Sequence, residues 1–510
     1  MPASPDSEIL LDLQEEIEAF LRALLHPVAS ENGTELCDLT KFEWALRIEY
    51  GKLVFEAWNR ERSLVRRVER VAHRDPSRLS LMARKPGGLE PIALEFHERG
   101  QIHTARTGGD RAHFRQEILA MLAREFPGWK FTRVSNRSDR EHSFSAWYTR
   151  GMAEQGPRAW AFLGLDEAEA AAASDAVLAF GLIWLDWLRA RDERLVVQGL
   201  KLFLPAGAIE LIAHRAACLD RRLAEIEIFR WTPGETRAVP VDLRDYGNVE
   251  TRLVPRRQGE ELMRWHQAML ADLLGDLLQT VDVIPDASAT ALSLRIRGLE
   301  IARLEGTQET RISFGLEGDR QRLGNQNRQE FMSLARRVVE LRSARNDHGN
   351  NDLYRLQAER WLESLLVRDI TKLDPALTPS CVYQQVPAFS GMDRGVIDLL
   401  SITRAGRLAV IELKLHEEIN LPMQGLDYWL RVKWLNDRGQ FPKFGYFSDA
   451  QPSPLPPLLY LVSPAFRFHS TTARVIRYFD PAIKVIQVGL NDGWRSGPKV
   501  LFRHEVRSGS

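Results

Sequence analysis

The sequence predicts a mixed α/β fold of several domains, and three observations lead to this prediction. The chain has 510 residues, 44% of them hydrophobic and 27% charged, which is core material for roughly two to four domains. Apolar side chains recur at helical spacing in some segments and in short strand-like runs in others. A polar segment rich in Asn and Asp, 345–352, separates the last third of the chain from the rest. We therefore expect domains at 1–150, 151–345 and 346–510.

The first two predicted domains combine helices and hairpins in an α+β arrangement. Apolar residues at helical spacing predict a helix within the first 25 residues, and the Tyr50-Gly51-Lys52 break predicts a hairpin over 42–58. A helix is expected over 112–125, and the region 158–230 is expected to be rich in helix. Further along the chain we expect helices at 260–278 and 329–343, with three short strands between them at 291–296, 300–304 and 310–314.

Composition limits the class of protein. Lys and Arg number 69 and so do Asp and Glu, so any nucleic-acid surface must be a local basic patch rather than a property of the whole chain. Three widely separated cysteines without a CxxC pair disfavour a disulfide framework and a thiolate zinc site. The N-terminus lacks the features of a signal peptide, and the most apolar stretch, 176–188, is too short for a membrane span and contains Asp186. We expect a cytoplasmic protein with no membrane contact.

The last third predicts the order helix, three strands, helix, strand. The expected elements are a helix at 354–370, strands at 382–387, 395–402 and 408–414, a helix at 421–436, and a strand at 458–462. Asp398 is the notable residue in this segment, because an ionised carboxylate within an apolar strand is costly to bury without a partner. On a hairpin Asp398 can lie beside Glu412, and Lys414 shares the strand face of Glu412.

This combination of side chains suits the hydrolysis of phosphodiesters. Two carboxylates are typical ligands of Mg²⁺, which keeps several waters and contacts a substrate phosphate, and Mn²⁺ is an alternative. A metal lowers the pKa of a bound water, and a neighbouring ammonium stabilises charge that develops on the phosphate. Asp398 and Glu412 are therefore candidate metal ligands, with Lys414 acting on the water or the phosphate.

The segment 353–488 resembles the PD-(D/E)XK nuclease superfamily, which has a restriction-endonuclease-like αβββαβ domain with a mixed central sheet. The resemblance rests on Asp398, on Glu412-Leu413-Lys414, and on Gln424 and Tyr428 in a QxxxY arrangement. Locally it is most similar to the catalytic domain of NucS-type endonucleases, with their G-x-[IV]-D-L-L strand. It implies that Gln424 orients a catalytic group or contacts the phosphate, with Tyr428 as part of the same motif.

The resemblance also implies a further glutamate on the preceding helix. Glu359 and Glu363 are four residues apart, and Glu363 is the preferred candidate. The proline that names the superfamily is replaced by Ile397, and the resemblance covers only the last third of the chain. It implies a Mg²⁺-dependent endonuclease that acts on DNA rather than RNA, in DNA repair or in defence against foreign DNA.

Other interpretations remain open at this stage. Asp398, Glu412 and Lys414 could form an ordinary salt bridge, and the domain could be an inactive nuclease fold that binds nucleic acid or serves assembly; a ribonuclease is a third possibility. Homodimerisation or a protein partner through the N-terminal region is also possible. Basic residues near aromatic ones are candidates for nucleic-acid contact, although solvated basic faces explain them equally well. These candidates are Arg133, Arg137, Arg140, Arg336 and Arg337.

Overall fold

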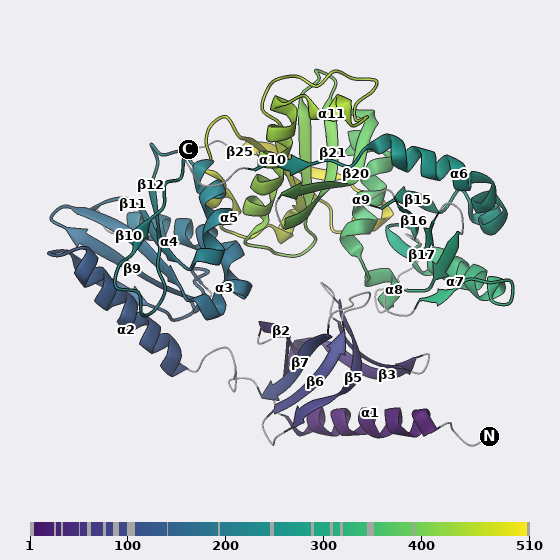
Figure 1. Cartoon of the computed structure of the whole chain (residues 1–510), viewed down its shortest axis with the longest axis horizontal. Coiled ribbons are helices and arrows are strands. Elements are labelled where there is room, and N and C mark those ends of the chain that lie inside the picture. Colours follow the sequence, from purple (N-terminus) through teal and green to yellow (C-terminus); the bar gives the residue numbers. More distant parts are fainter. Residues whose placement is uncertain are drawn as a thin grey trace. The chain divides into compact units, whose positions relative to one another are not determined.

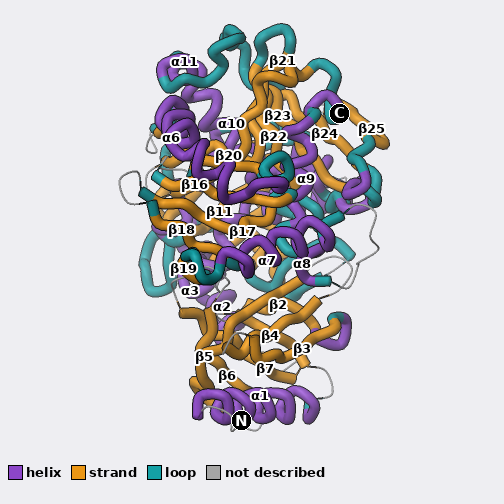
Figure 2. The backbone as a smooth tube through the Cα atoms, turned by 90° about the vertical axis from the view of Figure 1, so that its right-hand side faces the viewer, coloured by secondary structure: helices purple, strands orange, loops and turns teal. Residues whose placement is uncertain are grey.

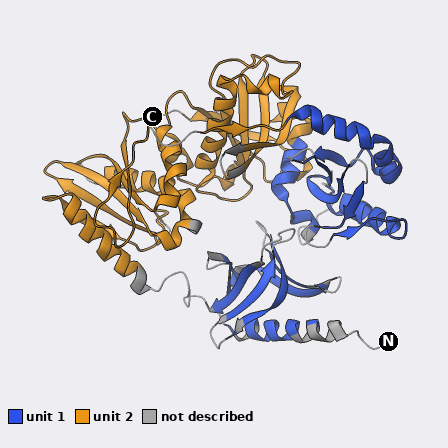
Figure 3. Cartoon of the chain, viewed as in Figure 1, with its two compact units in different colours: residues 1–105, 255–365 blue, residues 106–254, 366–510 orange. Residues whose placement is uncertain are grey.

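The structure is a computed structural model, in which two compact units are each built from two segments of the chain. One unit combines 1–105 with 255–365, and the other combines 106–254 with 366–510 (Figure 3). The described residues are 5–24, 27–31, 34–49, 52–58, 63–74, 78–84, 91–98, 108–139, 141–191, 194–244, 249–286, 290–306, 310–316, 320–343, 351–390 and 393–506. Residues 345–350 of the expected linker lie outside them.

The units divide the chain at other points than the expected domain boundaries. Residue 150 falls inside β9 (Tyr148–Gln155), which pairs with β8 (Lys130–Ser135) on one side and β10 (Arg158–Leu165) on the other. A boundary there would cut a continuous hydrogen-bonded sheet. The boundary after residue 365 falls within α9 (Ala358–Arg368).

The N-terminal segment of the first unit is a seven-stranded antiparallel sheet with one helix on it (Figure 1). Its strand order is β2-β1-β7-β6-β5-β4-β3, and α1 (Pro5–Ala23) contributes Ile17, Phe20 and Leu21 to the core. The hairpin expected over 42–58 is confirmed. The strands are β1 (Pro27–Glu31), β2 (Thr34–Asp38), β3 (Glu43–Glu49), β4 (Lys52–Trp58), β5 (Ser63–Arg74), β6 (Arg78–Arg84) and β7 (Pro91–Glu98).

The other segment of the first unit packs helices on a five-stranded antiparallel sheet, β15 to β19 in chain order. The helices and the three strands expected between residues 260 and 343 are confirmed within a few residues. The elements are α6 (Arg256–Leu274), β15 (Asp282–Pro285), β16 (Ala291–Ile296), β17 (Leu299–Glu305), β18 (Arg311–Phe314), β19 (Gln321–Arg322), α7 (Arg328–Leu341) and α8 (Asp352–Arg355). The helix expected over 354–370 is broken at Gln357, which has a positive φ of 47°.

The second unit begins with a six-stranded sheet, in the order β13-β12-β11-β10-β9-β8. Side chains alternate along β10, so that Ala161 and Leu163 face α4 (Val177–Arg191) while Trp160 and Phe162 face α2 (Gly108–Glu125). Most of the apolar stretch 176–188 thus belongs to a buried helix, α4. The expectation of helix from 158 was wrong for β10, because a strand covered on both faces loses the alternation that identifies strands.

The remaining elements of this sheet follow the same alternation of strand and helix. They are α3 (Glu167–Ala173), β11 (Val196–Leu204), α5 (Ala206–Ala217), β12 (Glu225–Arg230) and β13 (Val239–Pro240). β10, β11 and β12 run parallel to one another, and β8 and β9 complete the sheet in antiparallel fashion.

The second sheet of this unit has seven strands in the order β14-β20-β21-β22-β23-β24-β25. The three central strands β22, β23 and β24 are parallel, and the flanking ones are antiparallel. Figure 2 shows how helices and strands are distributed along the backbone. The elements are β14 (Thr251–Arg252), β20 (Leu377–Ser390), β21 (Asp393–Thr403), β22 (Leu408–Leu413), α10 (Leu421–Asp437), α11 (Gln440–Lys443), β23 (Leu458–Pro464), α12 (Thr472–Ile476), β24 (Lys484–Leu490) and β25 (Val500–Val506).

This architecture confirms the predicted mixed α/β fold class. Among the described residues, no helix is both long and apolar enough to cross a lipid bilayer. Cys37, Cys218 and Cys381 are buried free thiols. The parallel strands β22, β23 and β24 end at one edge of their sheet, and this edge carries the carboxylates singled out in the sequence.

Candidate active site

Asp398 and Glu412 lie on neighbouring strands of the second unit. β21 pairs antiparallel with β22, and Leu399 lies opposite Ile411, so the next position in this register places Asp398 opposite Glu412. The backbone N–H of Leu413 donates to Oδ2 of Asp398 at 3.0 Å, which fixes the Asp398 side chain against the end of β22. The juxtaposition of two carboxylates predicted from the sequence is thus present in the fold.

A kink in the sheet explains how an aspartate can stand within an apolar strand. Ile397 and Leu400 are three residues apart on β21, yet both pack into the same core, whereas a regular strand would turn them to opposite faces. Gln385, which the register places across from Asp398 on β20, has a positive φ of 52°. Such a backbone conformation is uncommon for a residue other than glycine and is frequent near functional sites. Nothing in the sequence around Gln385 predicted this kink.

Lys414 completes a charged cluster with Glu412. Its Nζ lies 3.5 Å from Oε1 of Glu412, and the exposed fractions of the two side chains are 16% and 4%. The N–H of Lys414 donates to the carbonyl of Val462 at 3.0 Å, so strand pairing with β23 continues one residue beyond β22. Glu412 and Lys414 therefore stay on one face of the strand, as their spacing predicted.

The helix α10 covers this face and brings Gln424 and Tyr428 to it. Burial raises the pKa of Tyr428 above its ordinary value, and the negative charges of Glu412 and Asp398 raise it further, so the phenol stays protonated. Gln424 lies one helical turn earlier on the same side, and its Oε1 is buried without a hydrogen-bond partner in the part of the chain that the structure describes. The QxxxY pair is therefore oriented toward the sheet.

Two glycines allow α10 to approach the sheet this closely. A Cβ on Gly395 would lie 1.9 Å from Nη1 of Arg431, and one on Gly425 would lie 2.7 Å from the Leu461 side chain. Arg431 in turn donates to the carbonyl of Ala388 at 2.6 Å, which ties α10 to β20. The glycine in the G-x-[IV]-D strand thus has a packing reason: a larger residue would push α10 away from the sheet.

The loop after Lys414 carries additional polar groups. His416 is half exposed, and its Nε2 lies 3.7 Å from Oε2 of Glu418. The hydrogen bond with His416 is the main cause that lowers the pKa of Glu418, and the charge of Lys414 contributes. His416 is thus a partly solvated loop residue beside the charged cluster.

The two glutamates expected to add a ligand lie on α9, in the other compact unit. Glu363 is 2% exposed, and its Oε2 lies 3.3 Å from Nη1 of Arg360. Glu359 is half-buried in the first turn of the same helix. Their participation in the site stays a prediction.

The donor set of the second unit fits a hard divalent cation. Asp398 and Glu412 supply carboxylate oxygens at one sheet edge, and Mg²⁺ commonly takes only one or two carboxylates, completing its shell with waters and phosphate. Within the described ranges, no group of three or more His, Cys, Asp or Glu side chains forms a complete metal cage.

An ionic cluster anchors α10 to the first sheet of the second unit. Arg215, on α5, is 2% exposed and binds Asp427 of α10 through Nε–Oδ1 at 2.9 Å and Nη2–Oδ2 at 2.6 Å. Burial lowers the pKa of Arg215, but the carboxylates of Asp427 and Asp175 outweigh it and raise the pKa above its ordinary value. Sequence reasoning missed this cluster, because its members come from distant parts of the chain.

The candidate nucleic-acid residues are distributed over both units. Arg133 and Arg137 are exposed around β8, and Arg133 has a positive φ of 52°. Arg336 and Arg337 are exposed on α7, where Nη2 of Arg336 lies 3.4 Å from Asp276. Arg140 lies outside the described residues. Contact of these arginines with nucleic acid stays a prediction.

Two other members of the basic and aromatic cluster at 131–150 belong to the core instead. Arg150 is 6% exposed, lies 4.5 Å over the ring of Phe144, and donates to the carbonyl of Arg137. Tyr148 is 1% exposed and donates to the carbonyl of Ala173 at 2.6 Å. Interleaved arginines and aromatic residues can therefore arise from cation–π packing as well as from ligand contact.

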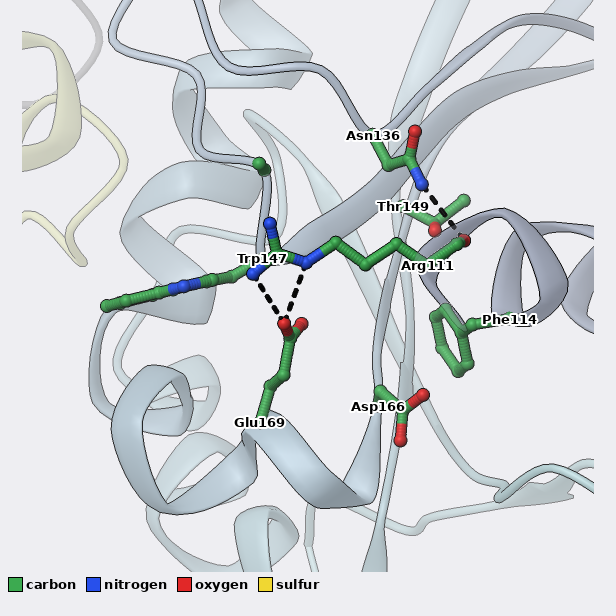
Figure 4. A pocket seen from close by; sticks show the side chains of 8 residues that line it. Arg111, Phe114, Asn136, Trp147, Thr149, Asp166 and Glu169 are labelled. Atoms are coloured by element: carbon green, nitrogen blue, oxygen red, sulfur yellow. Dashed lines mark hydrogen bonds and ion pairs between the residues drawn. The ribbon is translucent and has the colours of Figure 1, made fainter. Parts of the chain in front are cut away.

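In a small pocket nearby, two charged lining residues form an ion pair with each other (Figure 4). Arg111 forms two contacts with Oε1 of Glu169, at 2.9 Å from Nε and 2.7 Å from Nη2, while Asn136 donates to the Arg111 carbonyl. The charges of Arg111 and Glu169 thus satisfy each other within the fold. We assign no ligand to this pocket.

Comparisons with known proteins give no family. No protein-family model matches the chain, and no curated protein matches it. Among solved structures, Can2 from Sulfobacillus thermosulfidooxidans, determined in complex with cyclic tetra-adenylate, is aligned over 60% of this chain and 95% of its own. The sequence identity is 10% and the TM-score 0.13, which is too low to support any argument about fold or function.

Proposed function

We propose that this protein is a divalent-metal-dependent nuclease of the PD-(D/E)XK type that hydrolyses phosphodiester bonds in DNA. The proposal rests on one arrangement: the Asp398 side chain accepts from the N–H of Leu413, the residue after Glu412, Lys414 lies 3.5 Å from Glu412, and both carboxylates act on Tyr428 of α10. A bound cation would compensate the charge of the two carboxylates.

Each residue has a distinct role in this proposal. Asp398 and Glu412 would hold Mg²⁺ or Mn²⁺, which supplies an acidified water and neutralises charge on the scissile phosphate when bound. Lys414 places a positive charge beside Glu412, where it can orient the attacking water and stabilise the oxygens of the phosphorus centre in the transition state.

Gln424 and Tyr428 would act on the substrate or the water from α10. The Oε1 of Gln424 is buried and has no partner within the described residues, so it would accept a hydrogen bond from the attacking water only once metal or substrate binding opens the site. The Tyr428 phenol, whose pKa is raised, can donate to a phosphate oxygen. The exposed arginines would bind the DNA backbone through its phosphates.

The experiment is a cleavage assay with the full-length protein on labelled single-stranded, duplex and branched DNA and on matching RNA, with Mg²⁺, Mn²⁺ or EDTA. We expect metal-dependent cleavage of DNA that is lost in Asp398→Ala and Lys414→Ala. The exposed pair of Lys433 and Asp437, 2.5 Å apart on α10, gives matched controls, because Lys433→Ala and Asp437→Ala alter the same residue types away from the site. Cleavage that persists in Asp398→Ala would contradict the proposal, and cleavage of RNA alone would reassign the substrate.

One observation favours a second candidate, a nuclease-fold module that binds nucleic acid without cutting it. Glu412 is 3% exposed, so its carboxylate is less accessible than a metal ligand in contact with water usually is. DNA binding in EDTA without cleavage under any metal would support this candidate. A role in DNA repair or in defence stays a prediction from the sequence.

A further inference from the structure

The start of α10 contacts a residue from the six-stranded sheet segment of the second unit. Asp175 lies in a short 3-10 turn, Ser174–Ala176, between α3 and α4. Its Oδ2 accepts a hydrogen bond from Nδ2 of Asn420 at 2.5 Å, although the two residues are 245 positions apart in the sequence. Asn420 directly precedes α10 and is 4% exposed. A turn beside one sheet therefore contacts the beginning of the helix that covers the candidate site on the other.

The Asn420 side chain bonds Asp175 instead of capping its own helix. An asparagine in this position commonly accepts a hydrogen bond from a backbone N–H of the first helical turn, which stabilises the helix. Asn420 makes no such bond, and its Oδ1 is buried without a hydrogen-bond partner in the part of the chain that the structure describes. The side chain thus serves a contact between two distant segments rather than the local stability of α10.

A second contact holds α10 two helical turns further along. Nη2 of Arg215 lies 2.6 Å from Oδ1 of Asp175, and the same guanidinium binds both carboxylate oxygens of Asp427. Arg215 also donates to the backbone carbonyl of Asp175. Asn420 and Asp427 are seven residues apart and therefore lie on one side of the helix. Two anchors on that side fix the position of α10 and its rotation about its own axis.

The anchor at Asn420 adjoins residues of the candidate site. The backbone N–H of Gln424 donates to the Asn420 carbonyl at 3.0 Å, in the first turn of α10. On the other side, the backbone N–H of Asn420 donates to Oε1 of Glu418 at 3.2 Å, and the charge of Lys414 acts on this glutamate. A displacement of Asn420 would therefore move both Gln424 and the loop that leads back to Lys414.

We propose that Asp175 is a positioning residue for the candidate active site and acts through its hydrogen bond with Asn420. It sets where Gln424 stands relative to the carboxylate pair, and a displacement of about 1 Å in such an arrangement is enough to slow a reaction strongly. The segment that carries the six-stranded sheet thus controls the geometry at the edge of the seven-stranded one. The role of Asp175 in cleavage rests on the proposed nuclease function, whereas its hold on α10 does not.

The experiment exchanges the two members of this hydrogen bond in the full-length protein. Asp175→Asn leaves one acceptor oxygen for two donors, Asn420 and Arg215, and Asn420→Asp sets two carboxylates against each other. The double variant Asp175→Asn/Asn420→Asp restores one donor and one acceptor with their positions exchanged.

We expect the single-turnover rate on DNA to fall about tenfold or more in each single variant and to recover in the double variant. The Kd for DNA in EDTA should stay unchanged in all three, because no group that contacts the phosphates is altered. Asp437→Asn is the matched control, since it makes the same change at an exposed position of α10 and should leave the rate unchanged.

Hydrogen–deuterium exchange of the α10 amides gives a second readout that does not require cleavage. Amides at 421–426 should exchange faster in each single variant than in the wild type, while those at 432–437 should exchange equally, because only the start of the helix loses an anchor. The double variant should return to the wild-type exchange rates. Thermal melting of each variant checks folding. The Asp175 side chain is half exposed and Arg215 keeps Asp427, so Asp175→Ala gives a further test if a single variant fails to fold.

The outcomes separate this proposal from the nuclease proposal. Wild-type cleavage rates in both single variants, or a double variant as slow as the two separate losses combined, would overturn the positioning role while the nuclease proposal stands. If the wild type does not cleave DNA, the nuclease proposal fails and exchange decides the other. Faster exchange at 421–426 that the double variant reverses would then support the hold on α10, and unchanged exchange would overturn it.

Discussion

Two lysine–glutamate pairs on strands of the second unit look alike in sequence but differ in their surroundings. Lys201, on β11, is 4% exposed and bonds Glu227, its cross-strand partner on β12. Lys414 lies 3.5 Å from Glu412 at the end of β22. Both lysines have a further carboxylate nearby: the charge of Glu225 acts on Lys201, and Asp398 lies at the strand end that carries Glu412 and Lys414.

The other side chains around the two ammonium groups differ more than the carboxylates do. The Lys201 ammonium lies over the Trp160 ring at 4.0 Å and within 6 Å of Phe126, Trp129 and Phe229, so aromatic faces surround it. The Lys414 charge instead acts on Glu418 in the loop that follows β22. Aromatic rings around an ion pair indicate a structural pair, whereas carboxylates and a lysine at a strand end beside a polar loop indicate a candidate site for a cation and a phosphate.

The largest expected difference between the two lysines is in cleavage. Lys414→Met should lower the single-turnover rate on DNA by about a hundred- to a thousandfold, because a charge positioned for the transition state is lost. Lys201→Met should leave the rate nearly unchanged, since Lys201 belongs to the packing of another sheet. Equal losses in the two variants would mean that both lysines act only through the fold.

Arg215 and Asp427 form a third buried ion pair. It tests whether the loss of one charged partner lowers the free energy of unfolding at a buried pair outside the candidate site. Arg215→Met should lower the free energy of unfolding by about 3–5 kcal/mol, because Asp427 would be left buried without its counter-ion. The exposed pair of Arg256 and Glu260 is the control, and Arg256→Met should leave the urea midpoint unchanged. A small effect of Arg215→Met would show that water reaches Asp427.

The Lys201–Glu227 pair predicts an asymmetry between its two members. Glu227→Gln leaves the buried Lys201 ammonium without its hydrogen-bonded carboxylate and should cost about 1–3 kcal/mol in urea unfolding. Lys201→Met should cost less, because methionine keeps the contacts with the rings and Glu227 is partly exposed to water. The opposite order would indicate that the ammonium–ring contacts dominate over the ion pair.

The smallest expected effect concerns a buried group that stays neutral. Burial is the main cause that raises the pKa of the Cys218 thiol to about 12, and the nearby Asp427 and Asp480 charges add to it. At pH 8 its thiolate fraction should be roughly a thousandfold below that of an ordinary thiol, so alkylation by iodoacetamide should be slow until urea unfolds the chain. Because the pKa of Cys218 is higher in the folded than in the unfolded chain, the thiol contributes to the free energy of unfolding below about pH 8.5. This contribution is lost as the pH rises toward 12. Rapid alkylation of Cys218 in the folded protein at pH 8 would contradict this account.

Sequence patterns predicted most of the elements, including the fully buried strand β22, but missed the buried strand β10. The hairpin over 42–58, the helices α6 and α7, and the strands β21 and β22 were all expected within a few residues. β10 was missed because helices cover both of its faces and its apolar run carries no period. The expected boundary at residue 150 failed for a related reason, since pairing between β8 and β9 is not visible in local patterns.

For the candidate site, the sequence by itself determined the residue types and their order: Asp398 in an apolar strand, Glu412 and Lys414 two residues apart, and Gln424 four before Tyr428. Alternation along a strand and recurrence along a helix are local properties, so they can be read from spacing alone. Only the tertiary structure decided that Asp398 lies opposite Glu412, that a kink at Gln385 accompanies it, and that Arg215 holds α10 in place. These depend on register and on contacts between residues far apart in the chain, which no local pattern encodes.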